Sequence, residues 1–255
     1  MSPSTVVVHP DADTLAAATA ARLLLHLIDA QSTHRPLHVA LTGGGLGTQV
    51  LAQVAASSLR DAVDWTGVHL WWGDERFMPA GDPERNETQA RAALIEVLPI
   101  PGENVHAVPP ADAAGIRTPE DAAEAYATTL AEHAAATGPL DDAGPAVPAF
   151  DLILLGVGPD GHIASLFPGH DTLEVTDRAV VGVHGSPKPP SERVSLTYPA
   201  LEAAAEIWLV VAGADKSDAV GRALAGDDVR RTPAAGAKGR TRTLWLLDAT
   251  VAAEG

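Results

Sequence analysis

The chain alternates short apolar segments with longer segments rich in alanine and leucine. The apolar segments contain many β-branched residues, and several are apolar at consecutive positions, as in strands buried on both faces of a parallel sheet. Each of them predicts a β-strand. The eight segments are Val6–His9, His38–Leu41, Val68–Trp72, Leu152–Leu155, Val180–Val183, Val194–Thr197, Ile207–Val211 and Thr243–Leu247.

The alanine- and leucine-rich segments between them predict helices. Asp11 or Asp13 can cap the start of the first helix. Thr118 can cap the fourth, with Pro119 at the first helical position. We also expect a short helix directly after His162. The five longer segments are Thr14–Ala30, Thr48–Leu59, Glu87–Leu98, Glu120–Ala136 and Ser217–Ala225.

Strand and helix in alternation predict an α/β fold of three layers, αβα, with helices on both faces of a mostly parallel, Rossmann-like sheet. No shift in composition marks a boundary, so we expect a single domain over residues 1–255. Ligands of such folds bind beyond the carboxyl ends of the strands. The residues that follow each strand are therefore the ones to inspect for chemistry.

Charge narrows the range of partners. The chain has 17 Lys+Arg against 33 Asp+Glu, a formal net charge of -16 at pH 7. Such a surface repels nucleic acid and anionic membranes, so we expect neither as a partner. An anionic small molecule would need a few cations gathered locally against this background.

The amino-terminal segment and the cysteine content indicate in which cellular compartment the protein is expected. The first residues lack the basic region of a secretory signal, and no apolar stretch approaches the ~20 residues of a membrane span. The absence of cysteine excludes disulfides and thiolate metal sites, and is compatible with a reducing compartment. We expect a cytoplasmic protein.

A glycine-rich turn follows the second predicted strand. "LTGGGLG" places Thr42, Gly43, Gly44 and Gly45 between that strand and a helix. Glycines let backbone N–H groups approach an anion, and a helix N-terminus adds partial positive charge, so phosphate is the ligand this turn favours. A tight turn without a ligand is the alternative. The turn lacks the Lys-Ser/Thr ending of a nucleotide P-loop.

A second glycine-rich turn, "GVGPDG", follows the fourth predicted strand and matches the dinucleotide-binding pattern. Asp160 would place negative charge where a pyrophosphate must lie, and Pro159 removes one of the amides that would bind it. We therefore reject a dinucleotide site. His162 comes directly after this turn, and histidine exchanges protons near neutral pH. Asp160, two positions earlier, can orient the imidazole, which makes His162 a candidate acid or base.

Charged residues follow two further strands. "WWGDERFMP" groups Asp74, Glu75 and Arg76, which predicts either an internal salt-bridge cluster or a site whose arginine binds a carboxylate, a phosphate or an oxyanion. Lys216 begins a predicted helix, where a cation opposes the helix dipole, and Arg193 begins a strand. Both are candidate ligand-binding cations, with solvated surface as the alternative.

The sequence lacks the motifs of other common catalytic mechanisms. The chain has no G-x-S-x-G, no H-E-x-x-H and no closely spaced cluster of histidine and carboxylate with the spacing of metal ligands. Ser165 could face the same way as His162 on a helix. An acyl-serine enzyme would also need a separate base and an oxyanion hole, so this alternative is disfavoured.

Taken in order, "TGGG", "WWGDERFMP", "GVGPDGHIASLFPG" and "GADK" resemble the motifs of the 6-phosphogluconolactonase family, over nearly the whole chain. That family shares its fold with the glucosamine-6-phosphate deaminases, which resemble this chain but carry a glutamate five residues beyond the histidine. Phe167 stands at that position here. Thr42 and Gly47 replace the serine and the proline region of the usual first motif, and Ile163 replaces a common threonine.

The resemblance implies hydrolysis of 6-phosphogluconolactone, with His162 as the base, Asp160 holding its ring and Arg76 stabilising the oxyanion or the product carboxylate. It requires no metal and no organic cofactor. We expect a phosphorylated sugar lactone as the ligand, and a monomer or weak homodimer. An amino-sugar-phosphate deaminase or isomerase and a non-catalytic sugar-phosphate sensor stay open as alternatives. The residues expected to bind the substrate and its phosphate are Thr42, Gly43, Gly44, Gly45, Asp74, Arg193 and Lys216.

Overall fold

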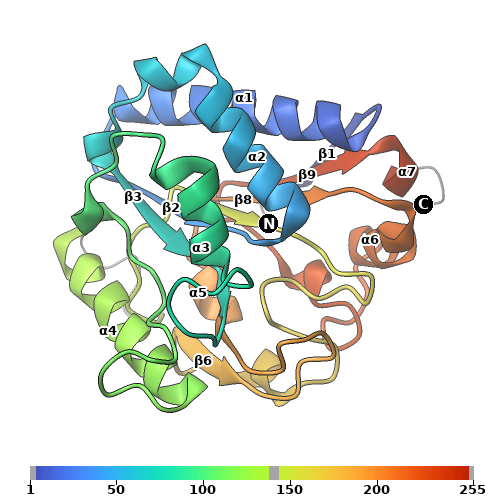
Figure 1. The fold of residues 1–255 in the computed structure, drawn as a ribbon. Coiled ribbons are helices and arrows are strands. Elements are labelled where there is room, and N and C mark those ends of the chain that lie inside the picture. The colour runs from blue at the N-terminus through green and yellow to red at the C-terminus, as the bar shows by residue number, and fades with distance from the viewer. Residues whose placement is uncertain (1–3, 138–143, 253–255) are drawn as a thin grey trace.

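The computed structural model describes residues 4–137 and 144–252 and is built around a six-stranded parallel sheet (Figure 1). The strand order is β1-β9-β8-β5-β2-β3, and every neighbouring pair is parallel. The predicted mostly parallel α/β fold is confirmed. The strands of this sheet are β1 (Ser4–His9), β2 (Leu37–Leu41), β3 (Val68–Trp72), β5 (Leu152–Leu155), β8 (Glu206–Val211) and β9 (Arg242–Asp248).

Helices cover both faces of the sheet. On one face lie α1 (Ala12–Gln31), α2 (Gly44–Ala56) and α3 (Asn86–Ala90), the last continuing as one π-helical segment, Arg91–Ile95. On the other face lie α4 (Pro119–Thr137), α5 (Tyr198–Glu202), α6 (Ser217–Leu224) and α7 (Ala249–Ala252). Within the described residues, no helix is both long enough and apolar enough to cross a membrane.

The two faces of the central strands explain why their sequences are apolar throughout. In β5, Leu152 and Leu154 pack into the core beneath α1 and α2, whereas Ile153 and Leu155 pack into the core on the side of α4. All four side chains are at most 2% exposed. A strand buried on both faces cannot alternate with polar residues, so a continuous apolar run is the signal it leaves in the sequence.

A second, three-stranded antiparallel sheet lies on the α4 side, with the order β4-β7-β6. Its strands are β4 (Asp74–Arg76), β6 (Val180–Val183) and β7 (Arg193–Leu196). Two of the eight predicted strands thus leave the parallel sheet. No helix connects them, because the proline-rich segment 184–192 is too short for the crossover that parallel strands need.

The predicted helix caps are present. Asp11 accepts a hydrogen bond from the Thr14 amide at 2.7 Å at the start of α1, and Thr118 accepts one from the Asp121 amide at 3.2 Å at the start of α4. The prediction of a helix directly after His162 is wrong. Residues 163–166 form a turn closed by the bridge between Ile163 and Leu166.

The chain leaves β2 and β5 toward opposite faces of the sheet. After β2 it enters α2 on one face, and after β5 it passes through Val157 and Ile163 into the core on the other face. Because β2 and β5 are neighbours, a crevice opens between their carboxyl ends, which is where ligands bind in open α/β sheets.

Candidate active site

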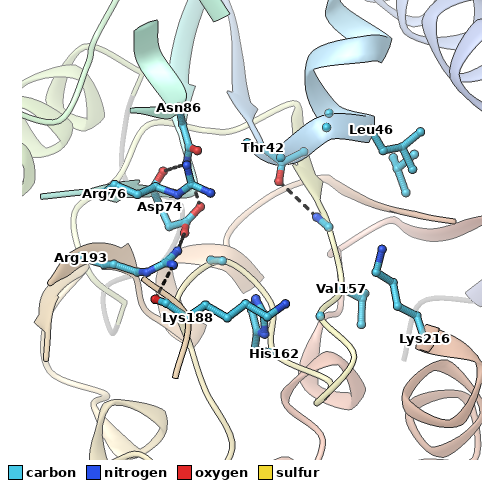
Figure 2. Close-up of a pocket in the computed structure, with 18 of the residues that line it drawn as sticks. Thr42, Leu46, Asp74, Arg76, Asn86, Val157, His162, Lys188, Arg193 and Lys216 are labelled. Carbon is cyan, nitrogen blue, oxygen red and sulfur yellow. Dashed lines mark hydrogen bonds and ion pairs between the residues drawn. The ribbon is translucent and has the colours of Figure 1, made fainter. Parts of the chain in front are cut away.

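The crevice at the carboxyl ends of β2 and β5 is a cleft of about 270 Å³ (Figure 2). Of the ten residues that sequence reasoning selected, nine line it, and Asp160 lies behind His162. The lining residues are Thr42, Gly43, Gly44, Gly45, Leu46, Gly47, Asp74, Arg76, Asn86, Gly156, Val157, Gly158, His162, Ala164, Lys188, Pro189, Arg193, Val210 and Lys216.

The first glycine-rich turn joins β2 to the N-terminus of α2. Gly44 has a φ of 83°, a conformation that residues with side chains rarely adopt, and it begins the helix. The Thr42 hydroxyl accepts a hydrogen bond at 3.2 Å from the amide of Gly156, in the turn that follows β5. Thr42 thus ties the two ligand-facing turns together, while the first amides of a 13-residue helix face the cleft.

His162 and Asp160 form a hydrogen-bonded pair beside the cleft. Nδ1 of His162 lies 2.5 Å from Oδ1 of Asp160, and the His162 side chain is 14% exposed. A Cβ on Gly158 would lie 2.1 Å from the His162 ring, so only glycine leaves room for the imidazole there. Phe167 packs against the other side of the pair, with its ring centroid 4.6 Å from that of His162.

The ionisation of Asp160 fixes the tautomer of His162. Burial raises the pKa of Asp160, but the hydrogen bond and charge of His162 outweigh burial and lower that pKa to about 2. Asp160 is therefore a carboxylate at neutral pH and can only accept a hydrogen bond. Nδ1 of the neutral imidazole then carries the proton, which leaves the lone pair of Nε2 for a substrate or a water molecule.

Asp74 is a buried carboxylate that connects three elements around the cleft. Its Oδ2 accepts a hydrogen bond from the Ser165 hydroxyl at 2.6 Å and lies 3.9 Å from the Arg193 guanidinium. The Asn86 side-chain amide donates to its backbone oxygen at 2.8 Å. Ser165 is fully buried, which is inconsistent with a nucleophilic serine.

Arg193 is 5% exposed and holds the loop between β6 and β7. Its guanidinium donates to the carbonyl oxygens of Lys188 at 3.0 Å and Pro190 at 3.2 Å, and it lies 5.8 Å from the centre of the Phe167 ring. Figure 2 shows Arg193 on the same side of the cleft as Asp74 and Arg76. This loop brings Lys188 to the cleft.

The buried Glu75 side chain holds the backbone on which Arg76 stands. Its carboxylate accepts hydrogen bonds from the backbone amides of Arg76, Asn86 and Glu87 at 2.7–2.9 Å, and the buried Arg85 guanidinium lies 3.8 Å away. Burial raises the pKa of Glu75 to about 7, against the opposing effects of Arg85 and these amides. The motif thus contains an internal cluster, and its Arg76 lines the cleft, where it can reach a ligand.

Lys216 lies at the other side of the cleft, directly before α6. Its ammonium donates to the carbonyl oxygen of Ala212 at 2.8 Å, and Figure 2 shows the side chain extending toward the space between Val157 and Leu46. The dipole of α6 disfavours a cation at this position, and the carbonyl contact offsets that effect.

Several lining residues are not indicated by the sequence alone. Lys188 stands in a proline-rich loop that resembles solvated surface, and Asn86 stands at a helix start where a capping role is the ordinary interpretation. With Lys188, the lining of the cleft carries two arginines and two lysines against the single carboxylate of Asp74. In a chain of net charge -16, this local excess of positive charge indicates an anionic ligand.

The fold and cleft define an α/β protein with a cationic ligand site and a histidine–aspartate pair at the switch point of its sheet. The chain belongs to the glucosamine-6-phosphate isomerase/6-phosphogluconolactonase family, whose sequence model matches residues 10–245.

Similar proteins include the 6-phosphogluconolactonase of Streptomyces coelicolor, 51% identical over 98% of this chain and 94% of the relative. That of Mycobacterium tuberculosis is 43% identical over 98% of each chain. A solved structure of 6-phosphogluconolactonase from Trypanosoma brucei superposes with a TM-score of 0.82, at 28% identity, over 99% of both chains.

Proposed function

We propose that the chain hydrolyses 6-phospho-D-glucono-1,5-lactone to 6-phospho-D-gluconate, the second step of the oxidative pentose phosphate pathway, in the cytoplasm. The single observation that carries the proposal is the presence of the His162–Asp160 pair and four cations in one cleft. Full-length identity of 51% to a protein named 6-phosphogluconolactonase supports the same activity.

His162 acts as the general base. Nε2 takes a proton from a water molecule as the water oxygen attacks C1 of the lactone, and the proton then passes to the ring oxygen as the bond from C1 to that oxygen breaks. A positioned base contributes roughly 10²–10⁴ in rate. Asp160 keeps the proton on Nδ1 and stabilises the imidazolium that forms. No metal or organic cofactor takes part.

The 6-phosphate binds at the N-terminus of α2, where Thr42, Gly43, Gly44 and Gly45 present backbone amides and Lys216 supplies a cation. Arg193 lies across the cleft, beside Arg76 and Asp74. The sequence predicts Arg193 as a phosphate ligand, but we place it at the lactone end because it lies on the same side of the cleft as Arg76. Arg76 and Arg193 there stabilise the oxyanion and the product carboxylate, while Asp74 orients Arg193.

A deaminase needs an acid or base where this chain has Phe167. That side chain is 1% exposed and packs against His162, so it places an apolar surface where deaminases of this fold are expected to carry a carboxylate. The sensor alternative shares every binding residue and differs only in turnover.

The test is the hydrolysis rate of the lactone generated in situ, measured above the spontaneous rate. The proposal expects rapid turnover of the phosphorylated lactone and much slower turnover of free glucono-1,5-lactone, because the phosphate orients C1. Ammonia release from glucosamine 6-phosphate would favour the deaminase. Binding of 6-phosphogluconate without lactone turnover would favour the sensor.

A further inference from the structure

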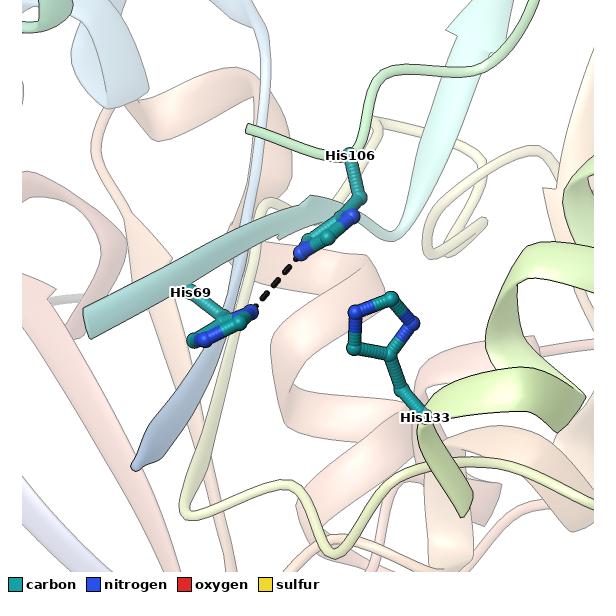
Figure 3. A group of neighbouring side chains, drawn as sticks. All are labelled: His69, His106 and His133. Carbon is teal, nitrogen blue, oxygen red and sulfur yellow. Dashed lines mark hydrogen bonds between the residues drawn. The ribbon is translucent and has the colours of Figure 1, made fainter. Parts of the chain in front are cut away.

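Three histidines from three separate segments converge away from the cleft (Figure 3). His69 lies in β3, His106 follows the 3-10 turn Gly102–Asn104, and His133 lies near the end of α4. One ring nitrogen from each lies within 4.8 Å of the other two. The sequence separations are 37 and 27 residues, so no local spacing motif marks the group.

The backbone holds this cluster in place. Leu70 in β3 bridges to Val105, and the His106 amide donates to the Leu70 carbonyl at 2.9 Å, which sets His106 beside His69. The His69 and His106 rings are nearly parallel, at 9°, with centroids 5.1 Å apart, and their nearest nitrogens face each other end to end. His106 and His133 meet edge to face at 4.3 Å. Figure 3 shows the His133 ring directed from α4 toward the other two.

A hydrogen bond selects the tautomer of His133 that a metal ion needs. Nδ1 of His133 lies 3.0 Å from the carbonyl oxygen of Thr129, which can only accept, so Nδ1 carries the proton and Nε2 is the unprotonated nitrogen. Metal-binding histidines commonly donate their second N–H to a backbone carbonyl in this way. Nδ1 of the neighbouring His38 instead accepts a hydrogen bond from the Trp71 indole at 3.1 Å. His38 therefore packs beside the cluster and is not one of the proposed ligands.

We propose that His69, His106 and His133 form a binding site for one divalent transition metal ion that prefers imidazole ligands, with Zn²⁺ as the leading candidate. Zn–N bonds of ~2.0–2.1 Å in a tetrahedron place ligand nitrogens about 3.4 Å apart. Nδ1 of His69 and Nε2 of His106 are 2.8 Å apart and share one proton, which must move to the other nitrogen of its own ring before both atoms can bind the ion. Small side-chain rotations therefore reach the required geometry, and water completes the tetrahedron.

The bound ion would connect α4 to β3, which is the edge strand of the central sheet. None of the three histidines lines the cleft, so the ion acts on stability and not on lactone hydrolysis. This site is thus independent of the proposed function, and each can fail without the other.

The test uses the full chain without a histidine tag, stripped of metal with a chelator and titrated with Zn²⁺ by calorimetry, and with Co²⁺ by visible absorption. We expect one ion per chain, a rise in melting temperature and the strong visible bands of tetrahedral Co²⁺. His69→Gln, His106→Gln and His133→Gln should each weaken binding more than the ~10- to 100-fold typical of losing an outer-shell partner. His34→Gln, which changes a half-exposed histidine outside the cluster, should leave it unchanged.

Retention of Zn²⁺ by all three cluster variants, or its loss in His162→Gln instead, would overturn the proposal. If a cluster variant does not fold, NMR spectra of the histidine side chains in the wild-type protein test the same site. Zn²⁺ should shift the resonances of His69, His106 and His133, and unshifted resonances at saturating Zn²⁺ would equally contradict the site.

Discussion

Nδ1 of His162 lies 2.5 Å from Oδ1 of Asp160, and both residues belong to a single turn that follows β5. The same Asp160 oxygen also lies 3.3 Å from the His162 amide, so the carboxylate holds both the backbone and the ring of its partner. Since the pKa of Asp160 is about 2, this arrangement persists over the whole neutral range of pH.

Asp160→Asn should lower kcat while leaving KM and the fold nearly unchanged. An asparagine amide does not stabilise an imidazolium and can present N–H to Nδ1, which favours the wrong tautomer. The loss should be smaller than that of His162→Gln, because the base itself remains. Steady-state kinetics on the lactone measure it, and wild-type kcat would exclude an orienting role for Asp160.

Gly158→Ala should lower kcat by ~10²-fold, because its Cβ would lie 2.1 Å from the His162 ring and displace it. Gly102→Ala is the matched control, since an added Cβ there meets no atom within 4 Å. The two variants should have similar melting temperatures and different activities. Equal kcat values would show that the position of the His162 ring is not critical.

Lys216→Met should raise KM for the phosphorylated lactone by ~10- to 100-fold, as expected for losing a charge-assisted hydrogen bond of about 1.5–3 kcal/mol. Turnover of unphosphorylated glucono-1,5-lactone should not change, because that substrate has no phosphate to lose contact with. Lys238→Met, at an exposed lysine outside the cleft, is the control. A similar loss on both substrates would remove Lys216 from the phosphate site.

Glu75→Gln should change how stability depends on pH. Burial raises the pKa of Glu75 to about 7 from an ordinary 4.5, so folding favours the protonated form. This contribution is fully present below pH 4.5 and is lost as pH rises through 7. The unfolding free energy of the wild type, measured with urea, should therefore fall relative to Glu75→Gln between those pH values. Parallel curves for the two proteins would contradict the raised pKa.

The central strands were predictable because burial on both faces leaves continuous apolar runs. β4 was not, since Asp74, Glu75 and Arg76 are polar and become a strand only by pairing with β7. The turn at residues 163–166 was also missed. There Ala164 adopts a φ of 48°, and Ser165 donates hydrogen bonds to distant Asp74 and Ser195, which outweigh the local helical preference.

The site residues also divide into those that a local sequence pattern marks and those that only tertiary contacts bring to the cleft. Thr42, Gly44 and His162 stand in short turns directly after strands, where residue type and strand position together indicate a ligand. Lys188 and Asn86 reach the cleft only because Arg193 holds one loop and Asp74 holds the start of α3. Such tertiary contacts leave no local pattern in the sequence.

The most direct measurement compares kcat of the wild type with that of His162→Gln on freshly generated 6-phosphogluconolactone, together with the affinity of each for 6-phosphogluconate. With His162 as the base, kcat should fall by ~10²–10⁴-fold while product affinity and melting temperature are retained. A His162→Gln protein that folds, binds 6-phosphogluconate and hydrolyses the lactone at the wild-type rate would contradict the account.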